Sequence, residues 1–201
     1  MKTVILIHGL HMHPIHLLYM KKALQKNSQL DIKLFGYKSL FFNDKVLDSY
    51  ASLIDSVPQE HDISIVAHSM GGLVSRLYLD KFKPQRNIKL ITLGTPHNGS
   101  CVAKKIQNTI FKPLLGQSVN AGLVNTINQW DNSYPLISIA GTTNIGIAKL
   151  FARNNLLPND GTVFVEETIV PNCTKHIILE GIHHTQLIFH KTAIEEVKKW
   201  I

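Results

Sequence analysis

A parallel β-sheet covered on both faces by helices is the fold that the 201-residue sequence predicts. Short apolar runs rich in β-branched residues recur along the chain with helical segments between them. Parallel strands that are buried on both faces read as such continuous apolar runs. The 44% hydrophobic and 17% charged residues are typical of a globular chain with one large core. This composition excludes a disordered, collagen-like or coiled-coil protein.

Six apolar runs are the expected strands, in a sheet that is mostly parallel. They are Val4–Ile7, Ile32–Phe35, Ile63–Ala67, Ile88–Leu93, Leu136–Ala140 and Ile177–Leu179. The expected helices are His16–Gln25, Asp44–Ser56, Met70–Phe82 and Gln186–Trp200. Apolar and charged residues alternate along the last of these segments as they do on an amphipathic helix.

The segment 99–134 does not fit this alternation. Its apolar residues recur at helical spacing, first as Val102, Ile106 and Ile110 and then as Val119, Leu123, Ile127 and Trp130. Segments inserted between the strands of open α/β sheets form lids and substrate-binding loops. We expect a single domain over residues 1–201, in which 99–134 is either a lid or acyl-pocket insertion or a pair of helices that pack in the core.

The net charge of +7, from 21 basic and 14 acidic residues, could attract an anionic lipid surface, a nucleic acid or an acidic substrate. The basic residues are scattered and are not interleaved with aromatic residues, which argues against nucleic-acid binding. The first apolar run ends at His8, too early for a signal peptide, and we expect a cytoplasmic protein. Cys101 and Cys173 are too few for a disulfide framework and are expected to be free thiols.

The sequence Ala-His-Ser-Met-Gly-Gly at 67–72 joins the third expected strand to the third expected helix. A serine at such a turn has a strained backbone that exposes its hydroxyl, and the residues two before and two after it must be small. Gly71 meets this requirement, and Ala67 meets it although glycine is usual there. The pattern predicts that Ser69 is a nucleophile, and the alternative is a helix N-cap.

A nucleophilic serine needs a base, and it needs an acid that orients the base. In this architecture the acid precedes the histidine in the chain, and both follow the serine. Asp160, in Asn-Asp-Gly-Thr-Val at 159–163, follows the fifth expected strand. The adjacent His183 and His184 follow the sixth strand, and both are candidates for the base. Three other carboxylates compete with Asp160: Glu166, Glu167 and Glu180.

The negative oxygen that forms during such an attack needs backbone N–H donors. One donor comes from the residue after the nucleophile, which is Met70. The other comes from the loop after the first strand, where His8-Gly9-Leu10 makes the Leu10 amide the expected donor.

These segments together resemble the α/β-hydrolase superfamily, and more closely its small bacterial lipases and esterases with an Ala-His-Ser-Met-Gly-Gly turn. Similar enzymes carry Thr-Leu-Gly-Thr-Pro-His-x-Gly, as at 92–99, and an Asn-Asp-Gly-x-Val segment that holds the acid, as at 159–163. The resemblance covers almost the whole chain and implies a three-layer αβα sandwich. It favours Asp160 as the acid and His184, followed by the aliphatic Leu187, as the base.

The expected activity is hydrolysis of a small-molecule or lipid ester through an acyl-enzyme on Ser69, without a cofactor. The residues expected to contact the substrate are His68, His97, Leu123 and Trp130. His97 has an alternative role, in which it braces the loop 94–99 through a backbone hydrogen bond.

Three other functions remain open at this stage. A thioesterase or an acyl-protein or amide hydrolase would use the same three side chains. A non-catalytic interaction protein could use the same fold. A metal-dependent hydrolase would use the clustered His8, His11, His13 and His16, and the lack of Asp or Glu in that stretch argues against it.

Overall fold

The structure is a computed structural model that describes residues 1–26, 29–124, 130, 133–143, 145–148 and 157–201. Within these residues, six parallel strands form one sheet in the order β2-β1-β3-β4-β5-β6. The strands are β1 (Lys2–Ile7), β2 (Asp31–Phe35), β3 (Asp62–His68), β4 (Ile88–Leu93), β5 (Leu136–Thr142) and β6 (Lys175–Glu180). Each strand contains one of the predicted apolar runs, so the prediction of a parallel sheet is confirmed.

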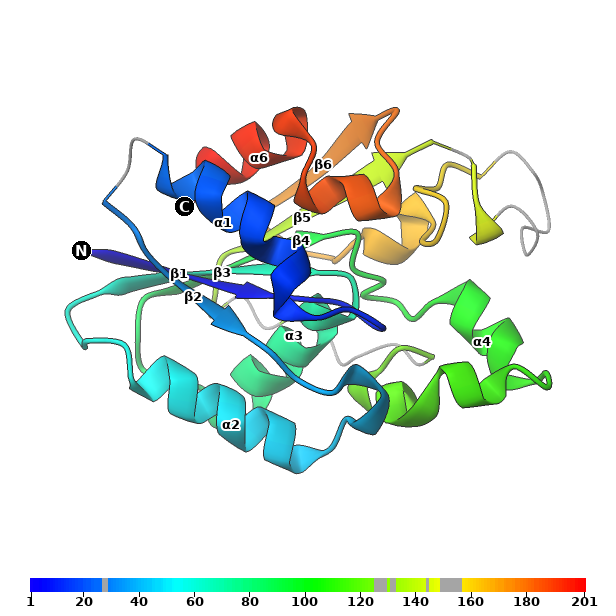
Figure 1. The fold of residues 1–201 in the computed structure, drawn as a ribbon, viewed down its shortest axis with the longest axis horizontal. Coiled ribbons are helices and arrows are strands. Elements are labelled where there is room, and N and C mark those ends of the chain that lie inside the picture. The colour runs from blue at the N-terminus through cyan, green and yellow to red at the C-terminus, as the bar shows by residue number, and fades with distance from the viewer. Residues whose placement is uncertain (27–28, 125–129, 131–132, 144, 149–156) are drawn as a thin grey trace.

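Helices cover both faces of the sheet (Figure 1). On one face, α2 (Asp44–Asp55) and α3 (Met70–Phe82) pack against alternate strand residues such as Ile5 and Ile7. On the other face, α1 (Leu18–Gln25) and α6 (Lys191–Lys198) pack against the residues between them, such as Val4 and Leu6. Successive side chains of a strand point to opposite faces, so a strand with a layer on each side is apolar throughout. The predicted three-layer αβα sandwich is confirmed.

The prediction of one continuous last helix over Gln186–Trp200 is wrong. The chain forms a 3-10 helix, η6 (His184–Ile188), and a separate α6 that begins after His190. The backbone of His190 is extended, and its ring Nδ1 accepts a hydrogen bond from the Thr192 amide at 3.3 Å. Both pieces bury their apolar residues, so hydrophobic spacing alone does not reveal the break. No helix in the described part of the chain is long and apolar enough to span a membrane.

The described part of 99–134 meets the alternative of two packed helices only in part. The short helix α4 (Cys101–Gln107) is followed by two 3-10 helices, η3 (Lys112–Leu114) and η4 (Gly116–Ala121). Gly122 ends η4 in the left-handed conformation, with φ +83°, a position that glycine adopts without strain. Ile110, expected on an inward face, is exposed. Ile127 lies outside the described residues.

Candidate active site

Ser69 lies at the carboxyl end of β3, at the turn into α3, with φ +52° and ψ −125°. A positive φ is strained for a residue other than glycine and persists only where the surroundings enforce it. Gly71 is one such constraint, because a Cβ there would lie 2.6 Å from the His8 carbonyl oxygen. Gly9 is another, because its Cβ would lie 2.9 Å from the Ser69 Cβ. The Ser69 side chain makes no capping hydrogen bond to α3, which removes support for the N-cap alternative.

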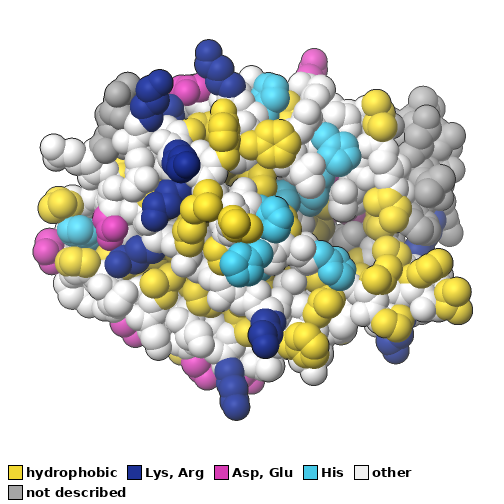
Figure 2. All heavy atoms as spheres, viewed as in Figure 1, with side chains coloured by type: hydrophobic (Ala, Val, Ile, Leu, Met, Phe, Trp, Pro, Cys, Tyr) yellow, Lys and Arg dark blue, Asp and Glu magenta, His cyan; other side chains and the backbone are white. Residues whose placement is uncertain are grey.

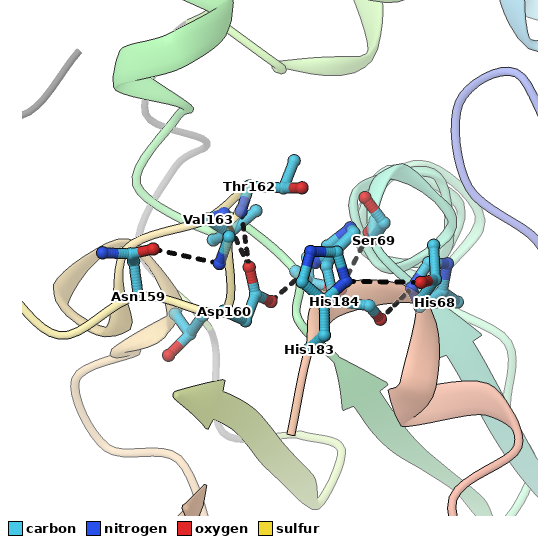
Figure 3. A network of polar contacts seen from close by, with 12 residues as sticks. His68, Ser69, Asn159, Asp160, Thr162, Val163, His183 and His184 are labelled. Atoms are coloured by element: carbon cyan, nitrogen blue, oxygen red, sulfur yellow. Dashed lines mark hydrogen bonds and ion pairs between the residues drawn. The ribbon is translucent and has the colours of Figure 1, made fainter. Parts of the chain in front are cut away.

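His184 forms a close pair with Asp160, and both side chains are buried. The Nδ1 atom of His184 lies 2.6 Å from Oδ2 of Asp160. The other carboxylate oxygen of Asp160 accepts hydrogen bonds from the backbone amides of Thr162 at 3.0 Å and Val163 at 2.8 Å. Figure 3 shows the His184 ring between Asp160 and Ser69. A carboxylate fixed by two amides holds the imidazole in one tautomer, with Nε2 free to accept a proton.

Gly94, which follows β4, makes room for this pair. A Cβ at this position would lie 2.8 Å from Nδ1 of His184 and 2.9 Å from Oδ2 of Asp160. Its φ of +60° also favours glycine. Gly94 is not among the predicted site residues, although its place within Thr-Leu-Gly-Thr-Pro at 92–96 is a signal for it.

The other three carboxylates considered as the acid lie elsewhere. Glu166 and Glu180 are exposed. Glu167 is buried, and its two oxygens accept hydrogen bonds from the amides of Cys101 and Phe164. It thereby joins the first residue of α4 to the loop that follows Asp160. The geometry therefore favours Asp160 as the partner of His184.

We expect the protein's stability to depend on pH through Glu167, because burial raises the pKa of this carboxyl from 4.5 to about 7. An acid with a raised pKa in the folded state contributes stability that is complete below the unfolded pKa and is lost as the pH rises through the folded pKa. Glu167→Gln should remove this dependence. The variant's free energy of unfolding, relative to that of the wild type, should be higher at pH 8 than at pH 4.5 by about 3 kcal/mol.

Urea unfolding of Glu167→Gln at the two pH values measures this difference, with the exposed Glu166→Gln as the matched control. The control should show little change with pH. If the free energy of unfolding of Glu167→Gln differs from that of the wild type by the same amount at both pH values, the raised pKa of Glu167 is contradicted.

The two backbone amides predicted to bind the oxyanion are those of Leu10 and Met70. In the described part of the chain, neither the Leu10 nor the Met70 amide donates a hydrogen bond to a protein acceptor. Met70 is the first residue of α3, where an N–H has no partner within the helix. Leu10 borders the same cavity as Ser69. Both amides are therefore available as donors, and their role stays a prediction.

His68 connects the turn at Ser69 to the backbone of His184. Its Nε2 lies 3.0 Å from the His184 carbonyl oxygen, and a carbonyl can only accept, so Nε2 carries the proton. Burial, and next the neighbouring His184, lower the pKa of His68 to about 3, so the ring is neutral. In the described residues the buried Nδ1 has no hydrogen-bond partner. His68 also borders the cavity, as a residue that contacts substrate should.

A cavity of about 450 Å³ opens beside Ser69 and His184. This volume is within the range of small-molecule sites in proteins. Its walls come from the loop after β1, from α4 and η3, and from the loop that carries Asp160. Most of the lining is apolar: Leu10, Met12, Pro96, Val102, Ala103, Ile106, Leu114, Leu115, Leu123, Ile147 and Val163. The cavity therefore suits an apolar group of a substrate whose reacting atom lies at Ser69.

His97 does not border this cavity. Its ring is buried between Oγ1 of Thr92, at 3.0 Å, and the guanidinium of Arg76, at 3.2 Å. Because Arg76 can only donate, Nδ1 of His97 accepts and Nε2 donates to Thr92. Burial, followed by the Arg76 charge, lowers the pKa of His97 well below 6.5. The His97 backbone amide also donates to the Thr95 carbonyl at 3.0 Å. These contacts fit the expected role of bracing the loop 94–99 and not that of lining the cavity.

Trp130 also lies away from the cavity lining. The Arg76 guanidinium lies 5.5 Å from the centre of its ring, and its indole N–H donates to the Tyr134 carbonyl at 3.2 Å. Helical spacing predicts Trp130 on the same face as Leu123, and residues 125–129 between them lie outside the described part of the chain. Of the two apolar residues expected to contact substrate, Leu123 alone borders the cavity.

The four amino-terminal histidines have separate positions. His8 is buried, its ring stacks on that of Tyr37 at 4.6 Å, and its Nδ1 is 2.9 Å from the Gly9 carbonyl oxygen. His11 borders the cavity. The exposed His13 and His16 bond to each other's backbone at the start of η1 (Pro14–Leu17). Among the described residues, no three His, Cys, Asp or Glu side chains gather as a metal site requires.

The sheet, its two helical layers and the strained serine turn at the carboxyl ends of the strands define an α/β-hydrolase fold. Within this superfamily, the chain belongs to the PGAP1-like alpha/beta domain family, whose model matches residues 19–195.

Solved structures with the same fold include two hydrolases and one synthase. A lipase of Bacillus licheniformis in its mature form has a TM-score of 0.74 and 17% identity, over 99% of this chain and 91% of that chain. A metagenomic carboxyl esterase has a TM-score of 0.70 and 12% identity, over 91% of this chain and 64% of that chain. Tomato methylketone synthase I, complexed with 2-tridecanone, has a TM-score of 0.65 and 13% identity, over 99% of this chain and 97% of that chain. At these identities the similarity shows the fold alone.

Proposed function

We propose that the protein is a serine hydrolase that cleaves carboxylic esters. The observation that carries the proposal is the strained turn at Ser69 beside an apolar cavity that the paired His184 also borders. The similarity in fold to a lipase and a carboxyl esterase supports an ester as the substrate. Thioesters and amides could react by the same chemistry, so the choice of ester is part of the proposal.

In the proposed reaction, Nε2 of His184 takes the proton from Oγ of Ser69 as Oγ attacks the ester carbonyl carbon. The Leu10 and Met70 amides donate to the negative oxygen, and Asp160 stabilises the imidazolium. When the tetrahedral intermediate collapses, the carbon–oxygen bond to the alcohol breaks and His184 returns its proton to the alcohol. Water then attacks the acyl-enzyme with His184 again as the base, which releases the carboxylic acid and restores Ser69.

The apolar cavity is the proposed site for the acyl group. We infer that the described part of 99–134 serves as an acyl-pocket wall, since α4, η3 and Leu123 all border the cavity. A series of acyl esters and thioesters of graded chain length, assayed against a Ser69→Ala blank, tests the proposal. We expect ester hydrolysis whose rate depends on acyl length. Turnover of thioesters alone would reassign the substrate class, and no turnover of either series would contradict the function.

Leu123→Ala should shift the preference toward longer acyl chains and also lower stability. Leu123 borders the cavity and packs in a buried cluster with Leu73, Ala103, Leu115 and Val124. Each added methylene that the enlarged pocket buries contributes about 0.8 kcal/mol, so the rate ratio of long to short esters should rise by up to about 15-fold per pair of carbons. The truncation should also lower the free energy of unfolding by about 2 to 5 kcal/mol.

Leu73→Ala is the matched control, because Leu73 packs in the same cluster and does not border the cavity. It should lose stability without a change in the rate ratio. If Leu123→Ala also lowers the melting temperature but leaves the rate ratio of long to short esters unchanged, Leu123 does not form part of the acyl pocket.

A further inference from the structure

Five large apolar side chains are exposed in the segments 110–114 and 145–147, and two of them line the cavity. Leu114 and Ile147 line the cavity and are nevertheless 53% and 43% exposed, so they mark its opening. Three neighbours in the chain are exposed further: Ile110 at 88%, Phe111 at 58% and Ile145 at 73%. We name these five residues the apolar rim. Exposed apolar residues that gather around a binding site mark an interaction surface more often than scattered ones do.

The two segments of the apolar rim are joined through α4. Ala148, next to Ile147, packs in a buried cluster with Val102 of α4. Ile106, one turn further along α4, packs against this cluster and against the cluster that contains Leu115, next to Leu114. Figure 2 shows hydrophobic side chains gathered on the right of the view, where α4 and the following segment lie in Figure 1. Both segments of the apolar rim are therefore next to residues that pack against α4, which lines the cavity.

Exposed lysines accompany the segment of the apolar rim that follows α4. Lys112 is exposed between Phe111 and Leu114. Lys104 and Lys105 of α4 are exposed as well, and Lys104 shares a surface pocket with Glu166 and Glu167. Exposed apolar residues interspersed with lysines are the composition of segments that lie in the interface of anionic membranes.

We propose that the apolar rim docks on the surface of an anionic lipid bilayer. The exposed side chains enter the boundary between headgroups and acyl chains, and the lysines contact the anionic headgroups. The mouth of the cavity then opens onto the bilayer, so an acyl chain passes from lipid into the apolar cavity without crossing water. This last consequence rests on the proposed ester hydrolysis, whereas docking itself does not.

Vesicle binding by the 201-residue chain with Ser69→Ala tests docking, because this variant leaves the lipids intact. Sedimentation with vesicles of phosphatidylcholine alone, and of phosphatidylcholine with phosphatidylglycerol, measures the affinity. We expect tighter binding to the anionic vesicles that weakens as salt is added. Adding Ile110→Ser and Phe111→Ser together should weaken this binding at least tenfold. Adding Lys112→Glu should reduce the preference for anionic vesicles.

Ile178→Ser and Lys175→Glu, on β6, are the matched controls, because Ile178 is a half-exposed apolar residue that does not border the cavity. Both should bind vesicles as the parent does. Unchanged binding after the double substitution at 110 and 111, or equal binding to both kinds of vesicle, would overturn the proposal. Self-association in analytical ultracentrifugation that the double substitution abolishes would overturn it in favour of an interface between two copies.

The same double substitution in the active protein separates docking from catalysis. Ile110 and Phe111 do not border the cavity, so the hydrolysis rate of a water-soluble short-chain ester should stay at the wild-type value. Ester hydrolysis without vesicle binding would contradict the docking proposal but not the proposed function. Vesicle binding without hydrolysis of any ester would contradict the proposed function but not the docking proposal.

Discussion

Replacing Ser69 with alanine should lower kcat for ester hydrolysis by more than about a thousandfold, because the hydroxyl is the proposed nucleophile. The fold should be retained. The strained turn is enforced by the close approach of Gly9 and Gly71 to their neighbours and does not depend on the hydroxyl. Steady-state kinetics on a series of esters, with the melting temperature of the same preparation, gives both quantities.

Ser100→Ala is the matched control for Ser69→Ala. Ser100 also borders the cavity, but its hydroxyl accepts a hydrogen bond from the Ala103 amide and caps α4. Losing this cap should cost about 1 kcal/mol of stability and leave kcat within tenfold of the wild type. A well-folded Ser69→Ala protein that keeps more than about a thousandth of the wild-type kcat would exclude Ser69 as the nucleophile.

The second large effect should distinguish the two adjacent histidines. His184→Ala should lower kcat by about a thousandfold or more, since it removes the base paired with Asp160. His183→Ala should stay within about tenfold of the wild-type kcat, because the His183 ring packs over Gly161 and its Nδ1 lies 3.3 Å from the Thr185 hydroxyl. Equal residual rates in the two variants, with melting temperatures unchanged, would contradict the assignment of His184 as the base.

The sheet could be predicted from the sequence because its signal is local. A strand buried on both faces is apolar at every position, so runs such as Ile63–Ala67 locate strands without knowledge of their neighbours. The break at His190 and the 3-10 helices after α4 carry no such signal. Apolar residues on both sides of His190 are buried whether or not the helix continues. After α4, apolar residues recur at helical spacing although η3 buries none of its residues. Hydrophobic spacing therefore located the buried segments but not the type of helix that they form.

The predicted site residues also differ in how far local sequence determines their positions. Ser69, Asp160 and His184 each follow a strand at the carboxyl edge of the sheet, where topology brings the ends of parallel strands together. The position of His97 depends on Arg76, a buried residue of α3 that local sequence does not connect to it. A motif thus indicates which loop a residue occupies, while the direction of its side chain depends on distant partners.

Fluorophosphonate labelling of the intact protein, followed by peptide mass spectrometry, tests the central claim that Ser69 is an activated nucleophile. The reagent bonds covalently to serine hydroxyls that an adjacent base activates. The account predicts one adduct, on Ser69, with labelling lost in Ser69→Ala and strongly slowed in His184→Ala. Protein that hydrolyses esters but gains no adduct on Ser69, or gains it at the same rate in His184→Ala, would contradict the account.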